Sequence, residues 1–168
     1  DDGLLRQVAA TGKPVILSTG MAGRTEIAHA VAVLRAGGTT DLILLRCTSS
    51  YPAPDAAMHL RSIPALAEAF GVPVGLSDHS LGATAPVVGV TLGACLVEKH
   101  LTLRRADGGV DSHFSLEPEE FADLVREVRR AEAMIGAPTF GPGAAEEGNI
   151  AFRRSLYVVR DMSPGERF

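Results

Sequence analysis

The sequence contains no tryptophan, only two cysteines and few aromatic residues, which make up 5% of its 168 positions. Two cysteines cannot build the multiple-disulfide framework of a small secreted domain. Cys47 and Cys95 each lie within an apolar run, so we expect both to be buried free thiols that serve packing. Hydrophobic residues nonetheless reach 46% of the chain, which is enough for one core.

An excess of positive charge is also missing, because 16 basic residues face 20 acidic ones and the net charge is -4. Nucleic-acid binding depends on cations that neutralise phosphates, so we exclude a nucleic-acid partner. No apolar run approaches the roughly 18 residues that span a bilayer, and the opening Asp1-Asp2-Gly3 lacks the regions of a secretory signal. We therefore expect a cytoplasmic protein without a membrane partner.

Four short apolar runs recur along the chain and predict buried strands. Helical spacing of apolar residues fills the intervals between them, and a longer amphipathic helix follows the last run, with Pro118 in its first turn. The predicted strands are Val15–Leu17, Leu42–Leu45, Val74–Leu76 and Cys95–Val97, the last continuing toward Leu101. Strands that alternate with helices predict an α/β fold with a parallel sheet.

Polar residues end every one of these runs: Ser18-Thr19, Thr48 to Tyr51, Ser77-Asp78-His79 and Glu98-Lys99-His100. An open doubly wound sheet would carry a glycine-rich phosphate turn after its first strand, and none is present. Polar strand ends instead favour a (β/α)8 barrel, whose chemistry lies at the carboxyl ends of its strands. Four strands make only half of such a barrel.

The sequence divides into three predicted segments. Residues 1–136 form the half-barrel, residues 137–150 are rich in proline, glycine, alanine and glutamate and read as a linker, and residues 151–168 begin another domain. Within this last segment Arg153 to Val159 is predicted to be its first strand. The turn Ser163-Pro164-Gly165 leads us to expect more structure beyond the end of the chain.

His79 and His100 are candidate metal ligands because they follow two successive strands. Neighbouring parallel strands lie about 4.8 Å apart, so both imidazoles can reach one ion. The alternative is that each histidine only hydrogen-bonds a loop carbonyl. Asp78 and Glu98 precede the two histidines and could either support these ligands or act as acid/base groups. Glu98 is the stronger candidate because it shares a strand face with His100, whereas Lys99 should face away.

The remaining candidates are weaker on their own. Asp111 lies in a glycine-rich turn where its carboxylate could accept bonds from sugar hydroxyls or simply face solvent, and Tyr51 could bind ligand or pack. We expect His29 and His59 to lie in helices and His113 in a loop, without a role in the site. The arginines at 126, 129 and 130 read as a solvated helix face.

Six ordered motifs then resemble the sialic acid (nonulosonic acid) synthases over nearly the whole chain. They are Lys13 to Met21 (KPVILSTGM), Cys47 to Pro52 (CTSSYP), Gly75 to His79 (GLSDH), Glu98 to His100 (EKH), Gly109 to Asp111 (GVD) and Ser115 to Pro118 (SLEP). The resemblance implies a barrel followed by a small antifreeze-like (SAF) domain, with residues 151–168 at its start. It also implies a homodimer in which that domain caps the partner's site.

The resemblance assigns roles to single residues. It implies a divalent cation, manganese or magnesium, on His79 and His100, and phosphoenolpyruvate near Ser77 and Ser49, where the family often has asparagine at the position of Ser49. Tyr51 and Asp111 match sugar-binding positions. The implied reaction condenses phosphoenolpyruvate with an N-acetylated amino sugar to a nine-carbon 2-keto acid and releases phosphate.

The acceptor sugar is predicted from the segment 108–118, which looks closest to pseudaminic acid synthases and implies a 2,4-diacetamido-trideoxyhexose. N-acetylmannosamine, the substrate of an N-acetylneuraminate synthase, is the alternative within the family. A non-catalytic truncated barrel is the alternative of another class. A Schiff-base aldolase is disfavoured because Lys99, the one strand-end lysine, should face away from Glu98 and His100.

Overall fold

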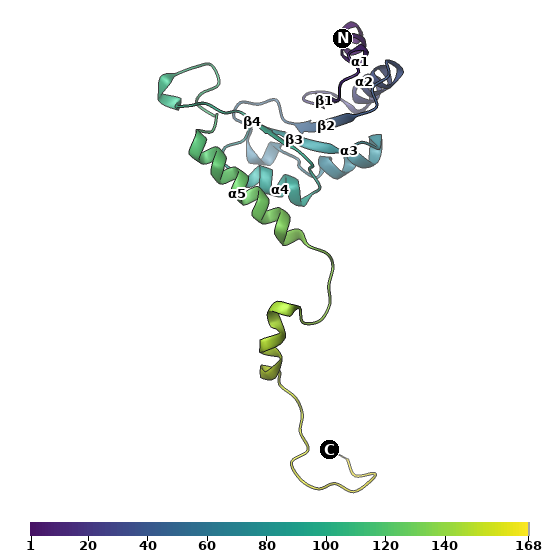
Figure 1. Ribbon diagram of the computed structural model, residues 1–168, viewed down its shortest axis with the longest axis vertical. Coiled ribbons are helices and arrows are strands. Elements are labelled where there is room, and N and C mark those ends of the chain that lie inside the picture. The colour runs from purple at the N-terminus through teal and green to yellow at the C-terminus, as the bar shows by residue number, and fades with distance from the viewer. Residues whose placement is uncertain (168) are drawn as a thin grey trace. The chain divides into compact units, whose positions relative to one another are not determined.

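The computed structural model describes residues 1–167 and divides into two compact units that meet at Gly136 and Ala137. In the first unit, four parallel strands alternate with helices in the order β1-β2-β3-β4 and form a half-barrel (Figure 1). The strands are β1 (Val15–Ser18), β2 (Leu42–Cys47), β3 (Val74–Asp78) and β4 (Val97–Lys99). The α-helices are α1 (Asp2–Ala10), α2 (Arg24–Ala36), α3 (Ser62–Phe70), α4 (Thr84–Thr91) and α5 (Pro118–Ile135).

The core lies between the sheet and the helices. β2 and β3 are the central strands, and their Leu44 and Leu76 side chains are inaccessible to solvent, as is Leu34 on α2. α3 and α4 pack on these strands, α5 packs against α4, and α1 packs against α2 (Figure 1). Gly75 lets β3 pack closely against the segment before β4, because a Cβ atom there would lie 2.6 Å from the carbonyl oxygen of Leu96.

The sequence located all four strands, but their ends differ. β2 and β3 extend two residues further than predicted, and β4 begins at Val97 rather than Cys95. Cys47 is buried as expected, whereas Cys95 is exposed, because it precedes the edge strand instead of lying within it. His59 was predicted to be helical but precedes α3 with a φ of 44°, while His29 lies in α2 as expected.

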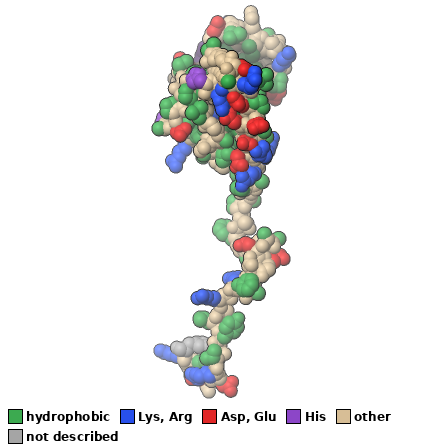
Figure 2. All heavy atoms as spheres, turned by 90° about the vertical axis from the view of Figure 1, so that its left-hand side faces the viewer, with side chains coloured by type: hydrophobic (Ala, Val, Ile, Leu, Met, Phe, Trp, Pro, Cys, Tyr) green, Lys and Arg blue, Asp and Glu red, His purple; other side chains and the backbone are tan. Residues whose placement is uncertain are grey.

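Helix α1 was not predicted, although the sequence signals it. The carboxylate of Asp1 accepts hydrogen bonds from the backbone amides of Gly3 and Leu4 and caps the helix. On α5 the predicted solvated arginines form ion pairs at i,i+3 spacing with Asp123, Glu127 and Glu132. Figure 2 shows the corresponding mixture of basic and acidic side chains on one face of the first unit.

The second unit begins at Ala137 and contains the 3₁₀ helix η3 (Ala144–Phe152), which crosses the predicted linker boundary at residue 150. The strand predicted over Arg153 to Val159 is absent from the described residues 153–167, and Leu156 and Val159 are almost fully exposed there. A strand needs a partner for its backbone groups, and this segment pairs with none. The SAF assignment stays a prediction, and Phe168 lies outside the described residues.

Candidate active site

Alternation along β3 and β4 sorts their last residues onto two faces. Ser77 stands opposite Glu98 and Asp78 stands opposite Lys99 in the parallel register. Side chains two residues apart share a face, so His79 and His100 extend the face of Ser77 and Glu98. The hydroxyl of Ser77 donates a 2.7 Å hydrogen bond to the carboxylate of Glu98. The sequence prediction that Glu98 and His100 share a face while Lys99 turns away is confirmed.

His79 and His100 lie side by side beyond the two strands. Their ring centroids are 5.2 Å apart and the ring planes meet at 69°. Nδ1 of His79 lies 3.0 Å from the carbonyl oxygen of Thr48. Because a carbonyl can only accept, Nδ1 carries the proton, and in the neutral ring Nε2 keeps its lone pair for a ligand.

The sequence left two alternatives open for His79, a metal ligand or a histidine that only binds a loop carbonyl, and this bond is compatible with both. The ring does bind a loop carbonyl, but it uses one nitrogen and leaves the other available, as metal-binding histidines commonly do. His79 is buried, and its carbonyl accepts a 2.8 Å bond from the amide of Ala53. The loop after β2 therefore holds His79 by both its ring and its backbone.

Two aromatic side chains pack around the histidines. Tyr51 lies 4.3 Å from His79 between ring centroids, and Phe114 lies 4.8 Å from His100. Tyr51 and Phe114 are themselves 5.4 Å apart, which closes a four-ring cluster. Phe114 is buried and was not predicted; its aromatic ring within the loop after β4 was the signal available in the sequence. Tyr51 keeps half of its surface exposed and can meet a ligand.

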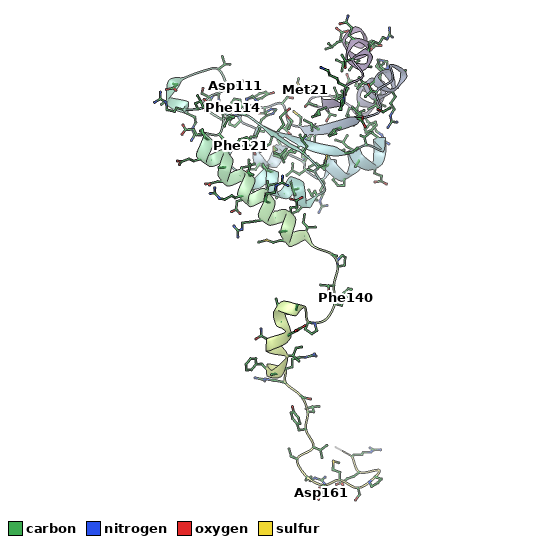
Figure 3. All side chains as sticks on the ribbon, viewed as in Figure 1. Met21, Asp111, Phe114, Phe121, Phe140 and Asp161 are labelled. Carbon is green, nitrogen blue, oxygen red and sulfur yellow. The ribbon has the colours of Figure 1, made fainter. Side chains whose placement is uncertain are left out.

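The loop between β4 and α5 brings Asp111 to the same cluster (Figure 3). Oδ2 of Asp111 lies 3.6 Å from Nδ1 of His100, and its side chain is about half exposed. This distance is longer than a hydrogen bond, so Asp111 lies beside His100 without binding it closely. Asp111 is thus in contact with the site and still accessible, as a residue that accepts bonds from a sugar must be.

Arg105 anchors this loop to the start of α5. Its guanidinium donates to both oxygens of Glu120, at 2.5 and 2.6 Å, and to the carbonyl oxygen of Ser115. Hydrogen bonds from Arg105 lower the pKa of Glu120 to about 2, and the amide of Glu117 adds to this effect. Glu120 therefore stays ionised near neutral pH, and its ion pair with Arg105 holds the loop that carries Asp111 and Phe114.

Ser49 lies on the β2 side of the site, next to β1. Its hydroxyl is 3.7 Å from Sγ of Cys47, which in turn is 3.9 Å from Nδ1 of His79. A Cβ atom on Gly20 would lie 2.3 Å from Oγ of Ser49, so only glycine leaves room for that hydroxyl. The structure thus places Ser49, Tyr51, Ser77, His79, Glu98, His100 and Asp111 at the carboxyl ends of the strands.

Asp78 is the one predicted candidate that the structure takes away from this face. Its carboxylate turns to the helix side of the sheet and binds Lys99, so it is not an acid/base group of the site. His29, on α2, pairs with Asp2 of α1 and makes no contact with the histidine pair. A separate apolar hollow between α4, β4 and α5, lined by Cys95, Val97 and Phe121, lies on the helix side too.

The donor set fits a divalent cation only in part. Residues 1–167 hold no group of three or more histidine, cysteine, aspartate or glutamate side chains able to bind a metal by themselves. His79 and His100 are close enough to supply two ligands, which leaves the remaining positions to water, to substrate or to groups outside the described residues.

Among the described residues no helix is both long and apolar enough to cross a bilayer.

Comparison with known proteins gives a consistent result. The NeuB family matches residues 1–139. An uncharacterized protein of Methanocaldococcus jannaschii is 48% identical over 164 residues, and the pseudaminic acid synthase of Campylobacter jejuni is 40% identical over 168. These cover 97% and 100% of this chain but 49% of each relative. The chain therefore spans about half the length of the curated relatives it matches.

A solved structure agrees with these sequence matches. The sialic acid synthetase of Leptospira borgpetersenii, determined in complex with citrate, superposes with a TM-score of 0.80 at 39% identity, over 92% of this chain and 54% of that one. The half-barrel predicted from the alternation of strands and helices is confirmed, and so is the resemblance read from the six motifs. This chain belongs to the NeuB family.

Proposed function

We propose that this chain forms half of the catalytic barrel of a cytoplasmic nonulosonic acid synthase. Such an enzyme condenses phosphoenolpyruvate with an N-acetylated amino sugar, forms a nine-carbon 2-keto acid and releases phosphate. The observation that carries the proposal is the pair of histidines 5.2 Å apart at the carboxyl ends of neighbouring strands, within a half-barrel of this family. The homodimer implied by the family resemblance belongs to the same proposal.

His79 and His100 would hold a divalent cation. Imidazole nitrogens suit first-row transition ions better than magnesium, which prefers oxygen ligands, so the donor set favours manganese. When bound, the ion would polarise the sugar aldehyde as a Lewis acid. The bond from His79 to the carbonyl of Thr48 fixes the ring tautomer that such a ligand needs.

The protein groups would divide the remaining work. Ser77 and Ser49 lie at neighbouring strand ends and would bind phosphoenolpyruvate. The Ser49 hydroxyl would donate to it directly, whereas the Ser77 hydroxyl, which donates to Glu98 in this structure, would turn from Glu98 to the substrate. The C3 carbon of that substrate forms the new bond to the aldehyde carbon while the carbonyl π bond breaks and the aldehyde oxygen takes up a proton. Water then adds at C2, which the attack leaves electron-deficient. Glu98, already a hydrogen-bond acceptor from Ser77, would take the proton of that water before C–O cleavage releases phosphate.

Tyr51 and Asp111 would bind the acceptor sugar, because both are accessible and touch the histidine pair. We propose a 2,4-diacetamido-trideoxyhexose as acceptor, on the resemblance of residues 108–118 to pseudaminic acid synthases. Overall identity does not decide the sugar, since it is 40% to a pseudaminic acid synthase and 39% to a sialic acid synthetase. N-acetylmannosamine is therefore the alternative acceptor.

The test is phosphate release from phosphoenolpyruvate by the full-length protein that contains this chain, with manganese and each of the two sugars. We expect sugar-dependent release that is lost in His79→Ala and in His100→Ala. His29→Ala is the matched control, because His29 pairs with Asp2 away from the site, and it should retain activity. Absence of release with both sugars would instead favour a non-catalytic barrel module.

A further inference from the structure

A buried ion pair lies directly behind the two histidines, on the helix side of the sheet. Nζ of Lys99 is 2.6 Å from Oδ2 of Asp78 and 2.5 Å from the carbonyl oxygen of Ser80. The other carboxylate oxygen of Asp78 accepts bonds from the amide and the hydroxyl of Ser80. The Lys99 and Asp78 side chains are only 2% and 0% exposed.

Each member of this pair immediately precedes one of the histidines. Asp78 and Lys99 are directly opposite each other and are the last paired residues of β3 and β4. Their bond therefore ties the two strands together at the point where His79 and His100 leave the sheet. Ser80 extends the tie past His79, so that this histidine is flanked on both sides by residues of the network.

The Asp78–Lys99 pair is the side-chain link between β3 and the carboxyl end of β4 on the helix side of the sheet, and the backbone of Leu116 holds the residues that follow β4. The strand has three residues, and within the described residues it pairs only with β3. His79 is fixed independently, since the loop after β2 binds both its ring and its carbonyl. His100 has the 3.6 Å contact with Asp111, its aromatic neighbours and a backbone bond from Leu116, and a single bridge between Leu101 and Leu116 follows it. The relative position of the two rings thus depends on the strand ends.

We propose that Asp78 and Lys99 are positioning residues that set the spacing of His79 and His100 for a shared cation. This inference rests on the proposed function, because it assumes that the two histidines bind one ion. Burying two charges is unfavourable unless they are paired and fully hydrogen-bonded, and here the partners come from both strand ends. The pair therefore specifies one arrangement of the two strands rather than simply adding stability.

The choice of lysine supports this role. The chain has 14 arginines and only two lysines, Lys13 and Lys99. An ammonium group is compact and can approach Asp78 and the carbonyl of Ser80 from a narrow space, whereas the planar guanidinium is larger and has a fixed donor geometry. We expect that Lys99→Arg does not substitute for lysine at this position.

The experiment measures manganese binding to the full-length protein rather than turnover. Electron paramagnetic resonance of free Mn²⁺ gives the dissociation constant, and the nitrogen couplings of bound Mn²⁺ report how many histidines ligate it. The variants are Lys99→Met, Asp78→Asn and the double variant, with exposed Lys13→Met as the matched control. His79→Ala tests the ligand itself.

We expect Lys99→Met and Asp78→Asn to weaken manganese binding by about 10- to 100-fold, as loss of groups that orient metal ligands typically does, and to reduce the coupling to one histidine. The double variant removes both buried charges, so it should recover thermal stability but not manganese affinity, because the tie between the strands is still missing. Recovery of affinity together with stability would show a purely structural pair and overturn the proposal.

Two further outcomes separate this inference from the proposed function. Wild-type affinity and two-histidine coupling in Lys99→Met or in the milder Asp78→Asn would refute positioning while leaving the metal site intact. Manganese binding that His79→Ala does not change would refute the shared metal site itself. If Lys99→Met does not fold, Asp78→Asn decides, because it keeps the shape of the side chain and its bonds to Ser80.

Discussion

At the residue scale, the ends of β3 and β4 show the same alternation of side chains between the two faces of the sheet. Ser77-Asp78-His79 and Glu98-Lys99-His100 each send the first and third side chains to the site and the middle one to the helices. The 21-residue repeat, from His79 to His100, is the length of one helix and strand unit. A single alternation thus produces both the reactive face and the ion pair behind it.

This alternation explains which site residues the sequence could predict. The histidines and Glu98 follow from strand ends and a period of two, without any knowledge of the register. The partner of Asp78 does not, because a cross-strand pair depends on how β3 and β4 align. The contact of Phe114 with His100 and the ion pair of Arg105 with Glu120 likewise depend on how a loop folds, and a loop has no regular sequence pattern from which to predict such contacts.

Glu120 gives a prediction on pH. Its pKa is lowered to about 2 by Arg105, so the folded protein gains stability from the carboxylate above the ordinary value near 4.5 and loses it as the pH falls toward 2. Glu120→Gln should therefore be less stable than the unmodified protein at pH 6, and the difference should shrink between pH 4.5 and 2. Urea unfolding of the full-length protein across this range measures it.

The control for this prediction is Glu119→Gln, which removes the same charge one position earlier in the same helix turn. Glu119 is exposed, and its carboxyl lacks the bidentate arginine contact. A difference between wild type and Glu120→Gln that stays constant down to pH 2, or an equal effect of Glu119→Gln, would contradict the assignment of the stabilisation to Arg105.

At the scale of elements, packing decides where sequence patterns succeed. α2, α3 and α5 have an apolar stripe against a polar face, and the sequence located each of them. α4 is apolar nearly all round, and the helical spacing of Val87, Val90 and Leu92 predicted it. The segment 153–159 has the β-branched and aromatic composition of a strand, yet composition cannot supply the partner strand that it needs.

Helix α5 gives a prediction at this scale, since it follows the loop that carries Asp111. Leu124 is 4% exposed on the face toward α4, while the next residue, Val125, is 43% exposed. Leu124→Ala should reduce the free energy of unfolding by about 2–5 kcal/mol, because it removes buried methyl groups. Chemical denaturation of the full-length protein measures this loss.

Val125→Ala provides the comparison on the same helix. Its side chain is already largely solvated, so we expect a loss below about 1 kcal/mol. Equal losses for the two variants would show that α5 is not docked through Leu124.

At the scale of the whole molecule, the half-barrel has two open edges. Within residues 1–167, β1 pairs only with β2 and β4 only with β3, so both outer strands present unpaired backbone groups. On β1 the side chain of Ile16 is 52% exposed, and it faces away from the core that its neighbours form. A closed barrel of eight strands has no such edges.

The 168-residue chain produced by itself should therefore self-associate as its concentration rises and show no sugar-dependent phosphate release. Sedimentation velocity over a concentration series measures the association, and the full-length protein is the control. A monodisperse monomer at every concentration, or turnover by the isolated chain, would contradict this expectation. Positioned groups from the remaining strands are needed for a site of this kind.

The burial of the Lys99 ammonium group also offers a way to detect separation of β3 and β4. Of the two lysines, Lys13 is exposed and Lys99 is enclosed between Asp78 and Ser80. An amine-directed reagent will therefore acylate Lys13 at once and reach Lys99 only when β3 and β4 separate. The rate at which Lys99 becomes acylated therefore measures how often the strand ends that carry the two histidines open.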